Sequence, residues 1–582
     1  TWFASLGPHS EGWIEEQTLT ATTPTSMLGQ AVAVRGTTAA VGSAGAVHIF
    51  ERVGAEWQET QAVTASSGSP LDRFGTYVAL DPMAETLVVG APGDGDNGSI
   101  AGAAYVFIRT AEGWLEQGKL LASDGQSGDE FGISAQVIGD VIFVGAFRGD
   151  LTGMDAGAVY AFERRDGSWS EIQIITPTDP TPFHNFGISV TVDSGDPLVG
   201  GAPDTVIIGA QHDNSNGGYA GAAYVFGRVD DGPGESRQWV EQSKLLASDG
   251  AVDDHFATSI ALSGERVLVG ARYHDLLGNN AGTAYVLVRG DGGVWTEEAK
   301  LLPSDGLAGD LFAMDVALSG DIAVLGSRGH DTDNGFNAGS VYVFTRGDDG
   351  WTEAERLDAD AGSGGDLFGD AVAISGGVIA IGAPMRDSAP PDPVADRGVA
   401  YIFALPRAAD GAPCTVVEQC DSGYCVDGVC CDSACGDGVD DDCQGCSIAA
   451  GAALDGVCAP LAAMSECRPA SGECDVAEYC DGVATICPDD ALAADGSSCD
   501  DGDACTEEDS CQAGQCQPGA MMCEPEPGPG ASDPDDPDAS SPGGCAVHTG
   551  RVAAGGPAGV LLWLLSLMAM GWAVRSRTRR RR

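Results

Sequence analysis

One segment recurs along the chain, and its clearest copy covers residues 72–125. That copy opens with Asp-Arg-Phe-Gly at 72–75 and continues through three short runs of β-branched, aromatic and small apolar residues. A fourth run begins at Trp114, and Gly, Pro, Asp and Asn separate the runs, as in turns between β-strands. A repeat of roughly 40 to 60 residues that holds four strands is typical of one blade of a β-propeller. The repetition therefore predicts an all-β ring of blades.

The copies align on two short signals. A Phe followed by Gly or Ala opens a copy, and Gly followed by Ala or Ser ends its second run. The opening pairs begin at Phe74, Phe131, Phe186, Phe256, Phe312 and Phe368, with a degenerate first copy at Leu28, and the second signal begins at Gly42, Gly90, Gly145, Gly209, Gly270, Gly326 and Gly382. The stretch from Ser26 to Pro406 resembles the FG-GAP repeats of integrin α-subunits and their bacterial relatives. This resemblance implies a seven-bladed β-propeller, to which we assign residues 26–407.

The two ends of the repeat region have complementary gaps. The segment around Trp13 matches the fourth run of a blade, yet no first three runs precede it. The last copy, from Phe368 to Pro406, lacks a fourth run. We therefore predict that a strand of the N-terminal segment, residues 1–25, closes the ring by completing the seventh blade. An open ring would expose two sheet edges, which promote aggregation.

A Trp recurs in the fourth run of the copies, and it allows two interpretations. The indoles could form a platform on which carbohydrate stacks, or they could pack between neighbouring blades. We favour packing, because the repeat explains a large apolar side chain at a fixed position more simply. The residues are Trp57, Trp114, Trp169, Trp239, Trp295 and Trp351.

The composition changes at residue 408, beyond which Cys, Asp and Gly dominate. None of the 19 cysteines precedes Cys414, and such density is typical of disulfides formed in an oxidising compartment. Zinc is the alternative, but no His lies between Cys414 and Cys523. We predict a disulfide-rich module over residues 408–523. Its predicted disulfide cysteines are Cys414, Cys420, Cys425, Cys430, Cys431, Cys435, Cys443, Cys446, Cys458, Cys467, Cys474, Cys480, Cys487, Cys499, Cys505, Cys511, Cys516 and Cys523.

Part of this module resembles a disintegrin domain. Residues 467–488 look like the core of that domain, and Glu473-Cys474-Asp475 stands where the family carries its adhesive tripeptide. The flanking cysteines, such as the adjacent pair Cys430 and Cys431, look more like Cys-rich modules of bacterial surface proteins. The resemblance implies a stalk with an adhesive segment.

The C-terminal part has the features of an envelope protein. Residues 524–544 are rich in Pro, Gly, Asp and Ser and predict a disordered acidic spacer. The apolar run 558–574 is about long enough for a transmembrane helix at roughly 1.5 Å per residue, and an Arg cluster follows it. The order of Cys545, helix and Arg tail in residues 545–582 resembles a myxosortase-type sorting signal, which implies processing and attachment at Cys545. A plain single-pass anchor is the alternative, and either one places the body of the protein at the cell surface.

The net charge of −57 excludes nucleic acid and anionic lipid headgroups as partners and favours divalent cations or basic partners. Loops after the second run carry acids that could hold Ca²⁺, which takes six to eight oxygen ligands. The best candidates are Asp94 and Asp96 in one copy and Asp331 and Asp333 in another. The Asp-x-Asp-Gly-x-x-Asp pattern of integrins is absent, so Asx-turns are the alternative. Ca²⁺ is the one cofactor that the sequence suggests.

Catalytic signatures such as Gly-x-Ser-x-Gly, His-Glu-x-x-His and a phosphate loop are absent from the sequence. The three Arg-Gly-Asp strings that begin at Arg148, Arg289 and Arg346 are expected to form turns. We predict a non-enzymatic surface protein that binds or adheres to an extracellular protein or glycan. Two alternatives are a secreted or surface hydrolase with its site at the channel mouth and an architectural envelope protein. The first residue is not Met, from which we expect that a leader has been removed or that the sequence is a fragment.

Overall fold

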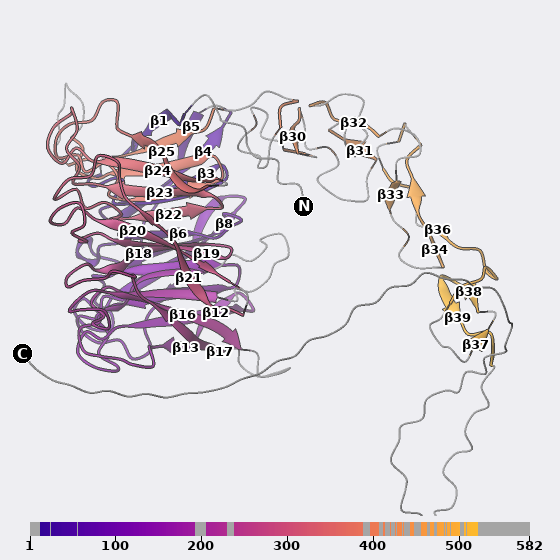
Figure 1. Cartoon of the computed structure of the whole chain (residues 1–582), viewed down its shortest axis with the longest axis horizontal. Coiled ribbons are helices and arrows are strands. Elements are labelled where there is room, and N and C mark those ends of the chain that lie inside the picture. The colour runs from indigo at the N-terminus through magenta and orange to yellow at the C-terminus, as the bar shows by residue number, and fades with distance from the viewer. Residues whose placement is uncertain are drawn as a thin grey trace, which may run out of the picture. The chain divides into compact units, whose positions relative to one another are not determined.

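The computed structural model of the chain describes residues 12–192 without 24 and 55, residues 205–229, residues 238–387 without 291 and 348, residues 396–406, and short stretches between 411 and 521. The chain divides into two compact units, residues 1–467 with 479–487 and residues 468–478 with 488–582. The first unit contains seven four-stranded antiparallel sheets, which are the blades of the propeller in Figure 1. The prediction of an all-β, seven-bladed propeller is therefore confirmed.

The first six blades each use four strands that follow one another in the sequence. The first blade consists of β2 (Ala31–Arg35), β3 (Thr38–Ser43), β4 (Ala46–Val53) and β5 (Glu56–Val63). The second consists of β6 (Tyr77–Leu80), β7 (Thr86–Ala91), β8 (Ala103–Thr110) and β9 (Gly113–Leu120), after a 3₁₀ turn at Pro70–Asp72. The third consists of β10 (Ser134–Ile138), β11 (Val141–Ala146), β12 (Ala158–Arg165) and β13 (Ser168–Ile175).

The next three blades repeat this order. The fourth consists of β14 (Phe186–Val192), β15 (Thr205–Ala210), β16 (Ala222–Val229) and β17 (Gln238–Leu245). The fifth consists of β18 (Phe256–Ser263), β19 (Arg266–Ala271), β20 (Thr283–Arg289) and β21 (Trp295–Leu301). The sixth consists of β22 (Val316–Ser319), β23 (Ile322–Ser327), β24 (Ser340–Gly347) and β25 (Gly350–Leu357). The first strand of each blade packs against the first strands of its neighbours, so these strands line the centre of the ring.

The seventh blade combines strands from both ends of the repeat region. It consists of β26 (Val372–Ser375), β27 (Val378–Ala383), β28 (Val399–Ala404) and β1 (Ile14–Leu19). Strand β1 lies antiparallel to β28, with Ile14 opposite Ala404 and Leu19 opposite Ala400. The N-terminal segment thus supplies the outermost strand of the sheet that holds the last repeat.

The core lies between the blades. Second strands such as β7 and β11 are buried along their whole length, because neighbouring blades cover both of their faces. The Phe that opens each repeat is buried too, and its ring lies 5.2–5.5 Å from the ring of a Tyr on the third strand, edge to face. Such a pair contributes about 0.5–1.5 kcal/mol beyond its buried area. The repeated Phe is therefore a packing residue.

The recurrent Trp residues pack across blade boundaries. The Trp239 ring on β17 lies 5.0 Å from the Phe143 ring on β11 of the preceding blade. Trp57 on β5 joins a buried cluster with Val378 and Ile402 of the seventh blade. The packing interpretation is confirmed for these two residues.

The Gly that ends each second strand is required by the next blade. A Cβ atom on Gly90 would collide with the backbone carbonyl of Gly132, which opens the following inner strand. Gly145 and Gly326 stand in the same relation to the blades that follow them. Because the obstacle is backbone, no side-chain rotation relieves it, and this explains the fixed Gly of the repeat.

The Cys-rich part contains disulfides in both units. The described bridges are Cys420–Cys430, Cys431–Cys446, Cys435–Cys458, Cys443–Cys480 and Cys467–Cys487 in the first unit and Cys474–Cys511 and Cys499–Cys516 in the second. The disulfide prediction is confirmed for these fourteen cysteines. Of the other predicted cysteines, Cys414, Cys505 and Cys523 lie outside the described residues, as does the side chain of Cys425.

Only short strands accompany these bridges in the part that the structure describes. They are β29 (Cys425–Val426), β30 (Val429–Cys430), β31 (Gln444–Gly445), β32 (Ala459–Pro460), β33 (Glu466–Arg468), β34 (Asp475–Val476), β35 (Glu478–Tyr479), β36 (Ala491–Leu492), β37 (Thr506–Glu507), β38 (Ser510–Gln512), β39 (Gln515–Gln517) and β40 (Ala520–Met521). Several cysteines are the most buried residues of these stretches, so disulfides replace a hydrophobic core here.

The predicted spacer 524–544, Cys545 and the apolar run 558–574 lie outside the described residues. Within the described residues, no helix is both long and apolar enough to cross a membrane.

Candidate functional site

One face of the propeller gathers two kinds of loop, and we call it the loop face. It is formed by the loops between the second and third strands and by the connections that lead from one blade to the next. Backbone hydrogen bonds join the two kinds of loop, as from the Gly128 N–H to the Ser99 carbonyl and from the Phe131 N–H to the Ala101 carbonyl. Loops on a rigid sheet scaffold are the usual position for binding residues.

Beneath the loop face, polar side chains meet at the blade boundaries. The Tyr224 hydroxyl on β16 donates to Asp179 Oδ1 at 2.9 Å and to Asp213 Oδ2 at 2.8 Å. Lys244 on β17 lies 2.8 Å from Asp213 and 2.9 Å from Asp179. Burial alone would raise the pKa of Asp213, but hydrogen bonds from Lys244 and Ser215 outweigh it and lower that pKa. These carboxylates are therefore held as structural ion pairs.

The predicted Ca²⁺ ligands fall into two different environments. Asp94 and Asp96 converge on the Lys119 ammonium, whose Nζ lies 2.6 Å from Asp94 Oδ2 and 2.7 Å from Asp96 Oδ2. Burial lowers the pKa of Lys119, but its hydrogen bonds to the two carboxylates outweigh that effect and raise it. Lys119 thus stands where a cation would be expected.

The second predicted pair is more open. Asp331 and Asp333 are both exposed, and Asp331 Oδ1 accepts a hydrogen bond from the Asn337 N–H at 2.9 Å, which is the contact of a capped turn. Among the described residues, the groups of three or more potential metal ligands that lie close together consist of cysteines, and these take part in the disulfides.

The arginines of the Arg-Gly-Asp strings are engaged by neighbouring acids. Arg148 lies 3.1 Å from Glu130, Arg289 lies 2.7 Å from Glu265, and Arg346 lies 3.0 Å from Glu298. Asp291 and Asp348 lie outside the described residues. Of the disintegrin-like tripeptide, Glu473 lies outside them too, and Cys474 is joined to Cys511.

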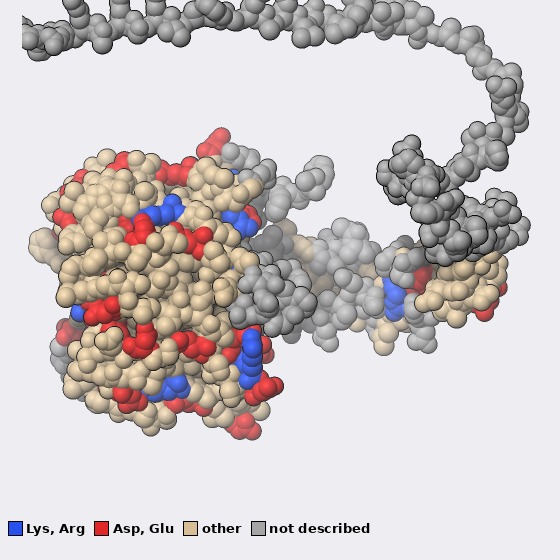
Figure 2. All heavy atoms as spheres, turned by 90° about the horizontal axis from the view of Figure 1, so that it is seen from below, with Lys and Arg blue, Asp and Glu red and all other residues tan. Residues whose placement is uncertain are grey.

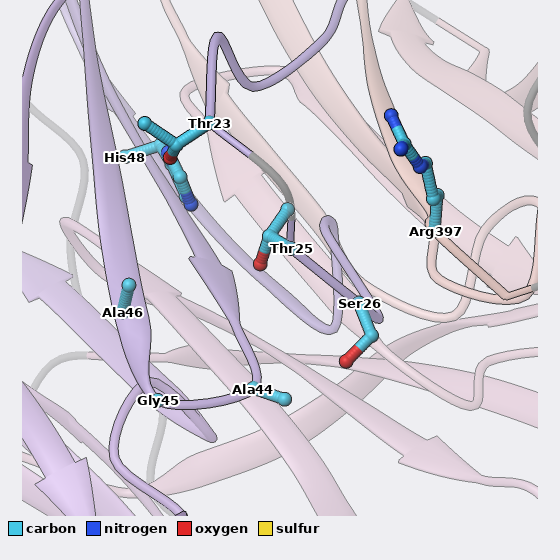
Figure 3. Close-up of a pocket in the computed structure, with 8 residues that line it drawn as sticks. All are labelled: Thr23, Thr25, Ser26, Ala44, Gly45, Ala46, His48 and Arg397. Carbon is cyan, nitrogen blue, oxygen red and sulfur yellow. The ribbon is translucent and has the colours of Figure 1, made fainter. Parts of the chain in front are cut away.

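A polar pocket of about 400 Å³ opens beside the first blade (Figure 3). It exists because only Ala44 and Gly45 connect β3 to β4, whereas residues 92–102 connect β7 to β8. Its lining combines hydroxyl side chains, the Arg397 side chain and the His48 ring. The His48 Nδ1 lies 2.7 Å from Glu59 Oε1, so its ring is already held by an internal partner. The full lining is Thr23, Thr25, Ser26, Ala44, Gly45, Ala46, His48 and Arg397.

The residue immediately before each opening Phe, or before Leu28 in the first copy, has a left-handed backbone conformation. Seven such residues, one for each blade, have φ between 54° and 59°, although none is a glycine. Each one lies on the connection that leads into the inner strand of its blade, and we call this part of the loop face the mouth. Strained backbone of this kind costs of order 1–3 kcal/mol and is concentrated at functional sites. The residues are Met27, Arg73, Glu130, Asn185, His255, Leu311 and Leu367.

At this mouth, a row of rings crosses the fourth and fifth blades. The His212 ring lies 4.8 Å from the Tyr219 ring and 4.7 Å from the His255 ring. The His255 ring lies 4.8 Å from the Tyr273 ring, over which the Arg272 guanidinium sits at 4.8 Å. All but the exposed Tyr219 are half-buried. We call Gln211, His212, Tyr219, His255, Arg272 and Tyr273 the mouth cluster.

Two polar atoms of the mouth cluster, His255 Nδ1 and Arg272 Nε, are buried and have no hydrogen-bond partner among the described residues. Burial lowers the pKa of His255 to about 4, with His212 and Arg272 adding to the effect. Burial also lowers the pKa of His212 and of Arg272. Native proteins rarely leave such groups unsatisfied, so the cluster is a candidate ligand site. The sequence prediction missed it, although the position before each Phe was a signal that could have been read.

The channel itself contains one strongly perturbed acid. Burial raises the pKa of Asp315 to about 6, although its carboxylate accepts hydrogen bonds from Ser259 Oγ at 2.8 Å and from the Val372 N–H at 2.9 Å. The neighbouring Asp370 is bound to Arg328 at 2.6 Å. Among the described residues, the acids at this place are thus fixed by internal partners, which does not favour the hydrolase alternative.

The excess of acidic residues in the sequence is visible on the surface of the propeller. In Figure 2, acidic side chains are spread widely over the propeller and basic side chains occur singly among them. Large apolar side chains are also exposed, and most of those in the propeller belong to the loop face. They include Leu71, Ile100, Leu151, Met154, Phe183, Tyr219, Val252, Leu276, Leu307 and Phe336.

Comparison with known proteins gives a family match over slightly more than half of the chain. The FG-GAP repeat model matches residues 57–107, 114–162, 169–226, 239–287, 295–344 and 351–403. Each match begins at the Trp of one outer strand and ends on the third strand of the next blade, so the sequence repeat is offset from the blade.

Curated relatives cover a much smaller part. The chain is 35% identical over 80 residues to the rat protein Disintegrin and metalloproteinase domain-containing protein 2, which is 14% of this chain and 10% of that protein. It is 37% identical over 123 residues to the human protein Disintegrin and metalloproteinase domain-containing protein 15, 20% of this chain and 12% of that protein. The chain therefore spans about a tenth of the length of these relatives.

Solved structures of low sequence identity were also found. The RRP9 WD40 repeats share 11% identity with a TM-score of 0.40, over 67% of this chain and 97% of that one. Saccharomyces cerevisiae Sqt1 shares 11% identity with a TM-score of 0.37, over 68% of this chain and all of that one.

Proposed function

Because the chain belongs to the FG-GAP repeat family, we propose that it is a non-enzymatic binding or adhesion protein of the cell surface, which engages an extracellular protein or glycan through the loop face. The disulfides support an oxidising, extracellular location. The disintegrin-like relatives support an adhesive role for the Cys-rich part.

One observation carries the proposal: large apolar side chains are exposed at the tips of the loop face in successive blades. Phe336 is 81% exposed, Met154 61% and Leu276 53%, and each belongs to a loop between second and third strands. Leu71 and Leu307, on connections between blades, are exposed to a similar degree. Exposed apolar groups that gather on one face of a soluble domain mark an interaction surface.

The test compares two faces of the whole protein. Beads coated with the full chain are incubated with extracellular proteins and glycans, and retained ligands are quantified. We expect Phe336→Ser combined with Met154→Ser to lower retention at least tenfold. The matched control is Met83→Ser combined with Val294→Ser, because these two exposed apolar residues lie on loops of the opposite face. Equal retention by both double variants would contradict the proposal.

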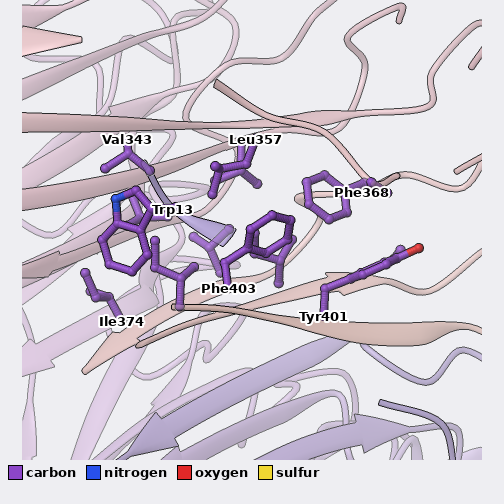
Figure 4. Packing of buried hydrophobic residues seen from close by; sticks show 14 of the residues in the cluster. Trp13, Val343, Leu357, Phe368, Ile374, Tyr401 and Phe403 are labelled. Carbon is purple, nitrogen blue, oxygen red and sulfur yellow. The ribbon is translucent and has the colours of Figure 1, made fainter. Parts of the chain in front are cut away.

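We propose in addition that the pairing of β1 with β28 closes the ring. Trp13, directly before β1, belongs to a buried hydrophobic cluster of the sixth and seventh blades, which Figure 4 shows from close by. Other members of this cluster are Val343, Leu357, Phe368, Ile374, Tyr401 and Phe403. The offset between sequence repeats and blades supports this proposal, because a blade assembled from two repeats leaves one outer strand to be supplied by the other terminus.

For the C-terminal part, we propose that Cys545 marks processing and attachment to the cell envelope, with a retained single-pass anchor as the alternative. The support is the order of the lone Cys545, the apolar run 558–574 and the terminal Arg cluster. Mass spectrometry of the mature C-terminus tests it. Loss of the residues after Cys545 is expected, and an intact terminal Arg cluster in the mature protein would refute it.

A further inference from the structure

We propose that the mouth cluster binds the carboxylate of an acidic saccharide, with the Arg272 guanidinium holding the carboxylate and the exposed Tyr219 ring stacking on a sugar ring. The inference rests on the proposed binding function and names a ligand class and a site within it. It differs from binding by the apolar loop tips Phe336, Met154 and Leu276, because the mouth cluster combines charged and aromatic side chains of the fourth and fifth blades.

Arg272 is the cation that needs an anion here. Of the arginines near the mouth, Arg73 and Arg148 are bound to Glu130 and Arg328 is bound to Asp370. Arg272 instead donates to the Met314 sulfur at 3.4 Å and, at the limit of hydrogen bonding, to Gln211 Oε1 at 3.5 Å, and it has a further hydrogen bond with Tyr273, so all three partners are uncharged or weakly polar. Its Nε has no partner among the described residues.

An unpaired half-buried guanidinium is costly unless a ligand supplies the negative charge. Although the chain carries an excess of acids, no carboxylate among the described residues forms an ion pair with Arg272, and Asp370, which acts on it from a greater distance, is bound to Arg328. Arg presents a planar fork of donors, which suits the two oxygens of a carboxylate.

His255 adds a second unsatisfied nitrogen near Arg272, whose charge acts on its ring. Its Nδ1 is buried without a partner, and its ring contacts both His212 and Tyr273. The titratable groups that face His212 and His255 are Arg272, His184 and Asp253.

The rings favour a saccharide over an acidic peptide. Four rings follow one another at spacings of 4.7–4.8 Å, and Tyr219 at the outer end is 43% exposed. Aromatic surfaces next to polar groups are typical of sites that combine stacking with hydrogen bonding. The nearby Asp253 disfavours a ligand of very high negative charge, so one carboxylate per sugar unit fits better than sulfate or phosphate chains.

The test uses the full chain with hexagalacturonate as the probe, measured by isothermal titration calorimetry. The fully methyl-esterified hexasaccharide removes the charge while it keeps the sugar chain, and hexaglutamate tests an acidic peptide. We expect hexagalacturonate to bind at least tenfold more tightly than either of the other two. Absence of binding, or tighter binding of hexaglutamate, would overturn the proposal.

Variants locate the site. Arg272→Gln should weaken hexagalacturonate binding at least tenfold, and Tyr219→Ala, an exposed position that tolerates change, should weaken it about fivefold. Arg148→Gln makes the same charge change on an arginine that already has an acidic partner, and it should stay within twofold of the natural chain. Equal weakening by Arg148→Gln and Arg272→Gln would show general electrostatics and refute the site. If no saccharide binds while the bead assay above still separates the two faces, this inference fails and the proposed function stands.

Discussion

Replacing Trp13 by Ala tests whether β1 holds the seventh blade together. Trp13 is 8% exposed, and its backbone N–H donates to Glu355 Oε2 at 2.7 Å. A buried Trp removes about 150–250 Å² from water, which at about 25 cal/mol per Å² gives roughly 4–6 kcal/mol as an upper bound. Trp→Ala substitutions in cores cost about 3–5 kcal/mol. We therefore expect a loss of about 3–5 kcal/mol in the free energy that keeps β1 paired.

The location of the loss matters more than its size. Strand β1 is joined to its blade by hydrogen bonds to β28 and by Trp13 and Leu19, both of which are buried. It can therefore open locally while the other blades stay folded. The appropriate assay is hydrogen exchange of the β28 amides followed by mass spectrometry. Because each 1.4 kcal/mol is a factor of ten, exchange in β28 should accelerate by roughly two to three and a half orders of magnitude.

The matched control is Trp114→Ala. Trp114 is 4% exposed and occupies the equivalent position on β9, which a tight turn connects to β8. The same side chain is lost, so a similar cost is expected, but exchange should accelerate in the second blade and not in β28. If Trp13→Ala leaves the β28 amides unchanged, or accelerates them no more than Trp114→Ala does, the idea that β1 closes the ring is wrong.

Three further predictions address the blades and the mouth. Gly90→Ala should lower the free energy of unfolding of the propeller by several kcal/mol, measured with denaturant, because the new methyl group meets the backbone of the next blade. The control is Gly118→Ala, which should change that free energy by less than about 1 kcal/mol, because no atom lies within 4 Å of the new methyl group. Lys119→Gln should lower the free energy of unfolding by about 1–3 kcal/mol, because the Asp94 and Asp96 carboxylates then face each other without a cation. Added Ca²⁺ should restore part of this loss. If Ca²⁺ leaves the melting temperature of the variant unchanged, the Ca²⁺ hypothesis is wrong. The pKa of His255 is lowered to about 4 in the folded protein, so the neutral ring stabilises the fold above its unfolded pKa of about 6.5, and that contribution is lost as the pH falls toward 4. The stability difference between the natural chain and His255→Gln should therefore shrink by about 1–2 kcal/mol between pH 7 and pH 4, and a constant difference would contradict the assignment.

Much of the architecture could be predicted from local patterns. The Phe that opens six of the seven copies and the Gly that ends every second run mark the blades, so the repeat count and the all-β class follow directly. The Cys density likewise indicated disulfides, which the described bridges confirm. These features repeat or cluster along the chain, so sequence order alone exposes them.

The candidate sites depended on contacts between residues that are far apart in the sequence. Lys119 lies on an outer strand and follows Asp94 and Asp96 by more than twenty residues in the sequence, so its ion pairs with these predicted Ca²⁺ ligands could not be predicted from the sequence. Tyr219 and Tyr273 likewise belong to different blades, and the curvature of the ring brings them to the same row.

By itself the sequence determined a ring of four-stranded blades followed by a disulfide-held segment. The reason is that strand patterns, turn residues and clustered cysteines are local features, which a few neighbouring residues define. Only the tertiary structure decided which side chains face one another across the channel mouth. The His255 ring of the fifth blade contacts the His212 ring of the fourth blade, and these surroundings arise only when the sheets pack around a common axis. Burial and electrostatics depend on these distances in space, which a linear order of residues does not contain.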